Sequence, residues 1–481
     1  MSIRNLRLNE TERVISRRSF RSSPGRPTLL VASTLIASCV ACGSGGTEAA
    51  RAPVSGAGAA AIAGSGGSGT AGSGGSGTAS SGASGSLNKA GSGGGGASSS
   101  GSGGTSGSPN AAAGSAGARV GSAGAPSVGA CDKLPEAGKW ESIAPNQAET
   151  GQDIGVINAQ GLALDPFNVG TIWMGASSVS PKSAGGLYKS TDCGATWLHV
   201  NTGMNGAKLD TAAMWSLVVD PVDQGTIYVV GSYGPNNLWK STDGGVNFKP
   251  LLGDELAANF AGNSVASVTI DPTDHLHLVI APHGKCEGPY APICNGESTD
   301  GGATWRFVVI PGTGWEEATG PYLLNATSWL STAHGLWLTK DNGASWKDIK
   351  PSNVNYVTGG EFTHRPFRKS PLGKYYLAVQ QENGLITSTD GESWTYIKGT
   401  PNFSYPVGFA IGGGRLYLGD VNGGGVQVAN EATPDQWTML PAPDAKYNAN
   451  IKGSVNLEYD EQHHILYSSN FEGGLWRMVT P

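Results

Sequence analysis

The chain has 481 residues, 75 of them glycine, and carries 31 basic and 37 acidic side chains. Residues 1–130 hold 10 of the basic and 3 of the acidic side chains, so residues 131–481 hold 21 and 34 and have a net charge of −13. A nucleic-acid-binding surface needs an excess of positive charge, so this balance argues against a nucleic-acid partner and favours neutral or cationic ones.

The N-terminal 42 residues have the features of an export signal. Seven arginines precede Thr28, and an apolar run follows from Leu29 to Ala41. This run is too short to span a bilayer as a mature helix. The segment Ser16-Arg17-Arg18-Ser19-Phe20 resembles a twin-arginine signal, which directs the export of folded proteins. Residues 1–42 are therefore predicted to be a bacterial export signal.

The end of this signal predicts a lipid anchor. Two small residues precede the cysteine in Ile36-Ala37-Ser38-Cys39, which resembles a bacterial lipobox. Cys39, or alternatively Cys42, is the predicted lipidation site, and ordinary secretion is the alternative. The expected location is the outer surface or the periplasm, with the membrane contacted through the lipid only.

Residues 43–130 are mostly Gly, Ser, Ala and Thr. Such a segment has too few large apolar side chains to offset its ordering entropy, so we expect a disordered tether. A flexible coil of this length spans roughly 50 Å. The folded part is therefore residues 131–481, which are long enough to bury one large core.

Four cysteines lie in the folded part, and an exported protein meets an oxidising environment. Cys286 and Cys294 enclose a short loop, which predicts a local disulfide. Cys131 and Cys193 then pair by elimination. Zinc is the competing interpretation, but the C-x7-C spacing lacks a second nearby pair. No metal site and no cofactor are predicted.

A repeat near 50 residues is the strongest pattern in residues 131–481. Its core is a hydroxyl residue, an Asp two positions on, then Gly and an aromatic residue, as in Ser190-Thr-Asp192-Cys-Gly194-Ala-Thr-Trp197. The aspartates of the five clear copies are Asp192, Asp243, Asp300, Asp341 and Asp390, and a degenerate sixth copy contains Asp435. Repeats of this length are typical of the four-stranded blades of a β-propeller.

These motifs resemble the Asp-box, or BNR, repeat family, with the pattern S/T-x-D-x-G-x-T/S-W. The resemblance covers residues 131–481. It implies a hairpin in which the Asp carboxylate and the hydroxyl accept backbone N–H bonds, Gly takes a positive φ and the Trp packs between blades. The five aspartates are therefore interpreted as structural residues.

A second unit precedes each motif, as in Leu217-Val-Val-Asp-Pro221, and predicts the first two strands of each blade. Blades are expected to start near Gly161, Ser216, Ser267, Tyr322, Glu361, Gly408 and Asn456. The seventh blade lacks a fourth strand, which Lys139–Ile143 can supply. We therefore predict an all-β fold, a single seven-bladed propeller closed by its N-terminal strand, in which Cys131 meets Cys193.

Propeller sites usually lie at the channel mouth opposite the Asp-box hairpins. Carboxylates expected there are the candidate catalytic residues Glu361, Glu382, Asp420 and Glu472. Aromatic and polar side chains expected there are the candidate substrate-binding residues Trp215, Tyr233, His283, Trp315, Tyr322, His334, Tyr405 and Asn422. Flat rings beside carboxylates suit sugars, whose apolar faces stack while the acids bind hydroxyls.

The order and spacing of the motifs within each blade also resemble those of xyloglucanase-type glycoside hydrolases. Those enzymes join two propellers and carry their catalytic residues on a segment for which this chain has Asn158-Ala159-Gln160, so their catalytic residues cannot be transferred. Sialidases need three arginines at the site. The arginines of residues 131–481 are instead expected on outer strands or at the Asp-box end of the channel: Arg306, Arg365, Arg368, Arg415 and Arg477.

We therefore predict a monomeric propeller directed at extracellular polysaccharide or oligosaccharide, with glycoside hydrolysis by paired carboxylates as its enzymatic form. The alternative is a non-catalytic binding or assembly propeller, as in sortilin-like and photosystem-assembly proteins. A polysaccharide lyase is a minor alternative, which His283 and Tyr290 leave open and the acidic charge disfavours. The sequence does not decide whether the chain is an enzyme.

Overall fold

The computed structural model describes most of the predicted folded part. The described residues are 131, 134–145, 158–177, 185–234, 237–253, 265–312, 320–352, 354, 367–379, 384–403, 406–421, 425–442, 454–470 and 473–481. The chain forms two compact units, Met1–Ala111 and Ala112–Pro481, and every described residue belongs to the second. The predicted signal, Cys39, Cys42 and the tether over residues 43–130 lie outside the described residues.

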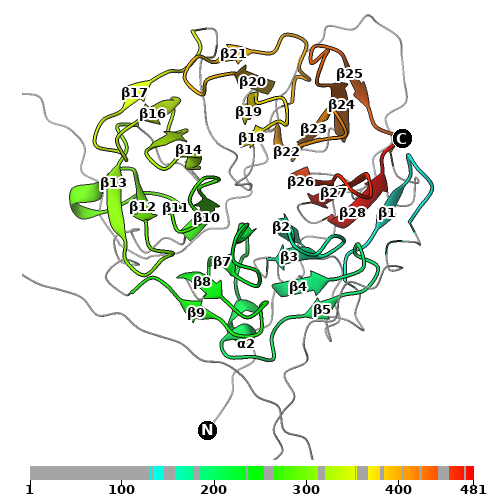
Figure 1. Cartoon of the computed structure of the whole chain (residues 1–481), viewed down its shortest axis with the longest axis horizontal. Coiled ribbons are helices and arrows are strands. Elements are labelled where there is room, and N and C mark those ends of the chain that lie inside the picture. The colour runs from blue at the N-terminus through cyan, green and yellow to red at the C-terminus, as the bar shows by residue number, and fades with distance from the viewer. Residues whose placement is uncertain are drawn as a thin grey trace, which may run out of the picture. The chain divides into compact units, whose positions relative to one another are not determined.

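Seven four-stranded antiparallel sheets form the described part, arranged as blades around a central axis (Figure 1). Blade 1 contains β2 (Ala159–Leu164), β3 (Ile172–Ala176), β4 (Gly186–Ser190) and β5 (Leu198–His199), and blade 2 contains β6 (Leu217–Val219), β7 (Ile227–Gly231), β8 (Asn237–Ser241) and β9 (Lys249–Pro250). Blade 3 contains β10 (Val265–Ile270), β11 (Leu278–Pro282), β12 (Cys294–Ser298) and β13 (Arg306–Val309). Blade 4 contains β14 (Tyr322–Asn325), β15 (Ser328–Ser331), β16 (Trp337–Thr339) and β17 (Lys347–Asp348). The prediction of a seven-bladed propeller is confirmed.

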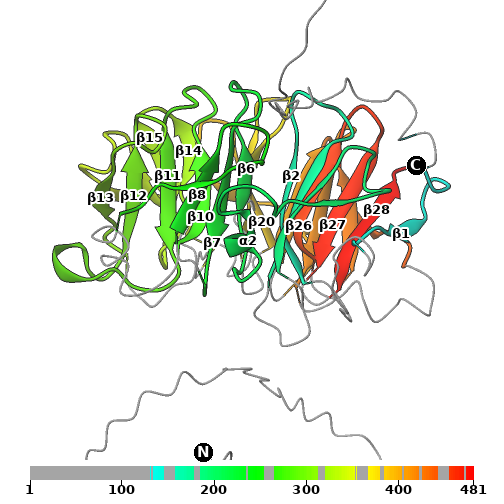
Figure 2. The same ribbon diagram turned by 90° about the horizontal axis from the view of Figure 1, so that it is seen from below.

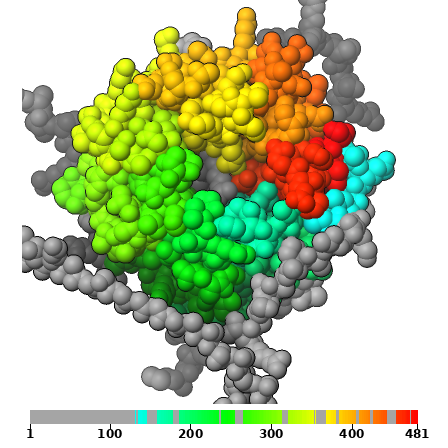
Figure 3. All heavy atoms as spheres, viewed as in Figure 1, coloured from blue at the N-terminus to red at the C-terminus, as the bar shows by residue number. Residues whose placement is uncertain are grey.

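The other three blades complete the ring. They are β18 (Phe367–Lys369), β19 (Tyr375–Val379), β20 (Gly384–Ser388) and β21 (Thr395–Tyr396); β22 (Pro406–Gly412), β23 (Arg415–Asp420), β24 (Val426–Asn430) and β25 (Trp437–Met439); and β26 (Ser454–Asp460), β27 (Ile465–Asn470), β28 (Gly474–Val479) and β1 (Trp140–Ser142). Figure 3 views the ring along its axis and shows the depression at its centre.

The N-terminal strand closes the last blade, as predicted. Strand β1 pairs antiparallel with β28, with Trp140 opposite Met478 and Ser142 opposite Trp476. The disulfide between Cys131 and Cys193 then joins the start of this segment to blade 1, with a Cα–Cα distance of 5.5 Å. Strand β1 and the C-terminal strand β28 therefore lie in the same sheet, which gives blade 7 its full complement of four strands.

The two ends of the blades differ in their connections, and Figure 2 shows the strands running between them. We call one end the Asp-box face, because it carries the turns between first and second strands and the hairpins between third and fourth strands. The loop face carries the connections between second and third strands and those between blades. The helical turn α2 (Gly206–Leu209) lies in the connection between blades 1 and 2.

The Asp-box hairpins form the hydrogen bonds that their sequence pattern implies. In blade 1, Gly194 N donates to Ser190 Oγ at 2.8 Å, and Thr196 N donates to Asp192 Oδ1 at 2.9 Å. Equivalent bonds engage Asp243, Asp300, Asp341 and Asp390. These carboxylates are used inside their own turns and hold the hairpins in shape.

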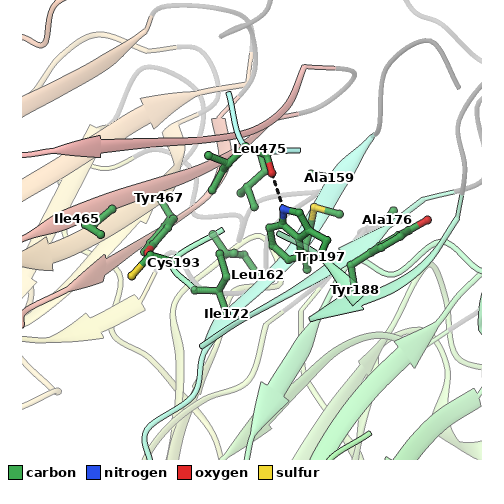
Figure 4. Packing of buried hydrophobic residues seen from close by; sticks show 12 residues of the cluster. Ala159, Leu162, Ile172, Ala176, Tyr188, Cys193, Trp197, Ile465, Tyr467 and Leu475 are labelled. Atoms are coloured by element: carbon green, nitrogen blue, oxygen red, sulfur yellow. Dashed lines mark hydrogen bonds between the residues drawn. The ribbon is translucent and has the colours of Figure 1, made fainter. Parts of the chain in front are cut away.

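The core consists of apolar clusters between neighbouring blades. Figure 4 shows the cluster between blades 7 and 1, where Tyr188 and Trp197 pack with Tyr467 and Leu475. Trp197 Nε1 donates to the Ile143 carbonyl at 2.6 Å, which ties the closing segment to blade 1. Each fully buried large side chain contributes about 1.5–3 kcal/mol. Within the described ranges, no helix is both long and apolar enough to cross a membrane.

Candidate functional site

Three of the predicted substrate-binding residues meet on the loop face. Trp215 precedes β6, Tyr233 follows β7 and His283 follows β11. Their ring centroids lie 5.2 Å apart for Trp215–Tyr233, 4.8 Å for Trp215–His283 and 5.3 Å for Tyr233–His283. The Tyr233 hydroxyl lies 3.2 Å from His283 Nε2. We call these three residues the aromatic cluster.

Tyr233 is the exposed member of the aromatic cluster. Its side chain is 55% exposed, whereas Trp215 and His283 are 4% and 6% exposed. Its backbone is left-handed, with a φ of 54°. A bulky residue seldom adopts this conformation, and such strain concentrates at functional positions. The phenol ring is therefore presented to solvent while a buried Trp and a buried His support it from behind.

The loop that carries His283 is fixed by a disulfide. Cys286 and Cys294 are bonded, which confirms the second predicted pair. Cys286 N donates to the Pro292 carbonyl at 3.0 Å, and Ile310 N donates to the Ile293 carbonyl at 3.0 Å. This second anchor joins the loop to the segment after β13. The position of His283 therefore rests on a closed, hydrogen-bonded loop.

The connection before β6 places Trp215 in the same way. Ala213 forms isolated bridges to Ser177 of blade 1 and to Ser232 of blade 2. The Ser232 hydroxyl donates to the Val265 carbonyl at 2.5 Å, which reaches blade 3. Trp215 packs against Ala213 and an alanine of β10. The aromatic cluster therefore sits where two main-chain bridges and one serine hydrogen bond join three blades.

The remaining described candidates are dispersed around the ring. His334 follows β15 with a φ of 50°, and burial lowers the pKa of its imidazole, which favours the neutral form near pH 7. Asp420 is the last residue of β23 and is buried. Tyr322 lies in the core between blades 4 and 5, where its ring stacks on Phe367 at 5.3 Å and burial raises the pKa of its phenol.

Six candidates fall outside the described residues. They are the carboxylates Glu361, Glu382 and Glu472 and the binding candidates Trp315, Tyr405 and Asn422. Among the described candidates, Asp420 is therefore the carboxylate on the loop face. It lies on blade 6, across the ring from the aromatic cluster on blades 2 and 3.

A central cavity of about 250 Å³ lies against the inner strands of blades 2 to 5. Pro221 and Pro272 line it, and both belong to turns of the Asp-box face. Arg368 also lines it and bonds to blade 7, where Nη2 lies 3.0 Å from Glu458 Oε1. This arginine stands on an inner strand at the Asp-box end, away from the aromatic cluster.

Sequence reasoning missed a buried charged network in blade 3. His277 Nδ1 lies 2.9 Å from Asp271 Oδ2, and Nε2 lies 3.0 Å from Glu297 Oε1; Arg306 contacts the other oxygen of Glu297. Burial opposes charging of His277, but its bonds to Glu297 and Asp271 outweigh burial and raise its pKa. The signal available in the sequence was Glu297, which stands where Lys240 stands in the preceding blade.

Two groups of described residues have the spacing of metal ligands. One contains Asp220, Asp223 and His275 on the Asp-box face, and the other contains Cys131, Cys193 and His463. In the first group Asp220 Oδ1 accepts the N–H groups of Val222 and Asp223, and Oδ2 binds His275 at 3.1 Å. Its carboxylate is therefore engaged in a turn and in a contact between blades.

No model of a known protein family matches the chain. It is similar in sequence to a xyloglucanase of Hypocrea jecorina, 27% identical over 241 residues, which are 49% of this chain and 25% of that protein. A Paenibacillus xyloglucanase is 26% identical over 266 residues, 48% of this chain and 24% of that protein. A probable oligoxyloglucan-reducing end-specific xyloglucanase of Neosartorya fischeri is 34% identical over 104 residues, 22% of this chain and 12% of that protein.

The matched regions span a quarter or less of the length of these relatives. In structure the chain is similar to an inactive variant of virginiamycin B lyase from Staphylococcus aureus, with a TM-score of 0.50 and 13% identity over 70% of this chain and 98% of that chain. At this identity the likeness concerns the fold alone. The predicted resemblance to xyloglucanases is confirmed at the level of sequence similarity.

Proposed function

We propose that this protein is an extracellular propeller that binds a neutral polysaccharide on its loop face, with the aromatic cluster as the stacking subsite. The observation that carries the proposal is the exposed Tyr233 ring held from behind by Trp215 and His283. A rigid, amphipathic ring matches the apolar face of a pyranose, and its hydroxyl can bond to a sugar hydroxyl.

The charge and the relatives support the choice of a neutral glycan. The net charge of −13 in residues 131–481 disfavours polyanions. The sequence relatives are xyloglucanases, which makes xyloglucan the first polysaccharide to test. An exported location fits the two disulfides, which persist in oxidising compartments. Lipidation at Cys39 or Cys42 is part of this proposal.

Glycoside hydrolysis is the proposed activity. It requires one carboxylic acid to protonate the leaving oxygen and a second carboxylate as base or nucleophile. Asp420 is the described candidate on the loop face, and its partner is one of Glu361, Glu382 and Glu472. The separation of the two carboxyl groups, about 5–5.5 Å or about 6.5–9.5 Å, would decide between retention and inversion.

Binding is tested by a glycan array with the wild-type chain, followed by titration with the best polysaccharide. Tyr233→Ala should weaken binding about 5-fold to 150-fold, corresponding to about 1–3 kcal/mol for loss of one stacking ring. Phe167→Ala is the matched control, because Phe167 is an exposed aromatic residue on the Asp-box face. Equal losses in the two variants would contradict the proposed subsite.

Hydrolysis is tested by product analysis on the polysaccharide that binds. Asp420→Asn and Glu361→Gln should each abolish turnover if that carboxylate acts in the reaction, while binding persists. Asp435→Asn is the control, because Asp435 lies on the Asp-box face of the same blade as Asp420. Binding without product in the wild-type protein would exclude hydrolysis and leave a binding propeller. Full turnover in a variant would remove that carboxylate from the reaction.

A further inference from the structure

The closing disulfide has a histidine beside it. Cys131 lies before β1, Cys193 lies in the Asp-box hairpin of blade 1, and His463 lies in the turn between β26 and β27. Cys193 Sγ is 3.9 Å from His463 Nδ1, and the two sulfurs and the ring nitrogen all lie within 4.8 Å of one another. Three separate parts of the chain thus bring together soft metal-ligating atoms at the point where the ring closes.

These separations are near those of a zinc site. Zinc binds sulfur at about 2.3 Å and imidazole nitrogen at about 2.0–2.1 Å in a tetrahedron, so S···N pairs lie about 3.6 Å apart and S···S pairs about 3.8 Å apart. The observed S···N distance of 3.9 Å already approaches this value. Reduction of the disulfide would let the two sulfurs separate to the required distance through side-chain rotation.

A carboxylate contacts the same histidine. Asp460 Oδ2 lies 2.8 Å from His463 Nδ1, and Asp460 Oδ1 accepts the N–H groups of Gln462 and His463 at 2.9 and 3.1 Å. These two bonds fix the carboxylate within the turn. An Asp oxygen binds zinc at about 2.0–2.2 Å, so movement of the Asp460 carboxylate toward the sulfurs would complete a set of two sulfurs, one nitrogen and one oxygen.

The framework around the sulfurs is held by contacts other than the disulfide. Cys193 N donates to the Gly170 carbonyl at 2.8 Å, and Arg477 Nη1 donates to the Cys193 carbonyl at 2.6 Å. Gly170 lies against both sulfurs, where a side chain would meet Cys131 Sγ at 2.8 Å. These contacts hold the Cys193 backbone and do not involve the S–S bond, so we expect Cys193 to keep its position when that bond is absent.

We propose that Cys131, Cys193, His463 and Asp460 form a zinc site in the reduced chain, and that oxidation exchanges the zinc for the disulfide. In the reduced state both thiols lose their protons and bind Zn²⁺ as thiolates. A disulfide oxidant then takes two electrons from the two thiolates, the S–S bond forms and Zn²⁺ leaves. In the reverse direction a dithiol reductant supplies the two electrons.

This exchange would keep the ring closed on both sides of a membrane. A chain exported in the folded state, as the twin-arginine-like segment predicts, has to fold in the reducing cytoplasm, where a disulfide does not persist. Zinc would join the same three segments there. After export the disulfide takes over without any change in the blade contacts.

The test uses the full chain with Cys39, Cys42, Cys286 and Cys294 replaced by Ser, so that the two remaining thiols are those of the site. The protein is reduced with a phosphine in the absence of oxygen and titrated with Co²⁺, which reports thiolate ligation through its charge-transfer absorption. One Co²⁺ per chain is expected, and Zn²⁺ should displace it. A folded reduced protein, by circular dichroism, without this absorption would overturn the proposal.

Two histidine variants provide the decisive comparison. His463→Ala should weaken Co²⁺ binding at least tenfold, whereas His464→Ala, on the next residue of the same turn, should leave it unchanged. The same two histidine variants are also made in a chain that keeps Cys286 and Cys294. In these proteins, zinc release on adding a disulfide oxidant is measured with a chromogenic chelator. One zinc released per closing disulfide is expected, and equal affinities in the two variants would refute the site.

Discussion

Removing the closing disulfide should destabilise the propeller more than removing the local one. The Cys131–Cys193 bond joins positions 62 residues apart, and the chain-entropy relation gives about 4 kcal/mol for a loop of that size. The Cys286–Cys294 bond joins positions 8 residues apart, for which the same relation gives about 2.5 kcal/mol. The difference arises because the longer loop loses more freedom in the unfolded chain.

The measurement compares Cys131→Ser/Cys193→Ser with Cys286→Ser/Cys294→Ser in guanidinium chloride, followed by tryptophan fluorescence with a metal chelator present. The closing variant should retain a cooperative transition, because Trp197 and main-chain bonds from Gly138 and Ile143 still hold β1. Its free energy of unfolding should fall about 2 kcal/mol further than that of the other variant. Equal losses, or a larger loss for the local pair, would refute the loop-length reasoning.

Three further predictions concern single side chains. His277→Gln should lower the free energy of unfolding by about 3–5 kcal/mol, because it removes the cationic partner that the buried carboxylates of Asp271 and Glu297 share. Because the folded-state pKa of His277 is raised, its contribution is present below about pH 6.5 and is lost as pH rises through the folded pKa. The difference between variant and wild type should therefore shrink on going from pH 6 to pH 9 in denaturant titrations. The pKa of Asp300 is lowered to about 2, mainly by hydrogen bonds from the Thr304 side chain and backbone. Its contribution to the free energy of unfolding is therefore present above about pH 4 and is lost as pH falls toward 2. Asp300→Asn should flatten the acid limb of the curve of stability against pH. Trp197→Phe should cost about 1–3 kcal/mol, measured by the denaturation midpoint, because the Ile143 carbonyl loses its 2.6 Å donor.

Most of the fold could be predicted from the sequence because each blade depends on local turn chemistry. The Asp-box hydroxyl, carboxylate and glycine bond within a few residues of one another, as Ser190, Asp192 and Gly194 do. Their spacing therefore indicates the length of one blade, and the seven predicted first strands give the blade count. Closure by Lys139–Ile143 was predicted because the seventh blade lacked a fourth strand, and it agreed with the Cys131–Cys193 pair that elimination had left.

The candidate site could be predicted only in part, because its contacts cross between blades. Tyr233 and His283 are 50 residues apart, and each was predicted to face the channel mouth because each follows a second strand. Their contact depends on the left-handed Tyr233 backbone and on a closed loop, which strand patterns do not encode. His463 is 270 residues from Cys193, so no local spacing could indicate the zinc site proposed there.

Blade 3 shows how one repeat can depart from the common pattern without losing its fold. In blades 1 and 2 a third-strand lysine lies over a second-strand aromatic ring, as Lys240 lies over Tyr228 at 5.0 Å. In blade 3 the same paired positions hold Glu297 and Val279. Trp329 of the next blade packs against Val279 and fills the space that this smaller side chain leaves, while His277 compensates for the negative charge of Glu297. Because an unpaired buried carboxylate and a cavity each cost several kcal/mol, these changes are tolerated only together.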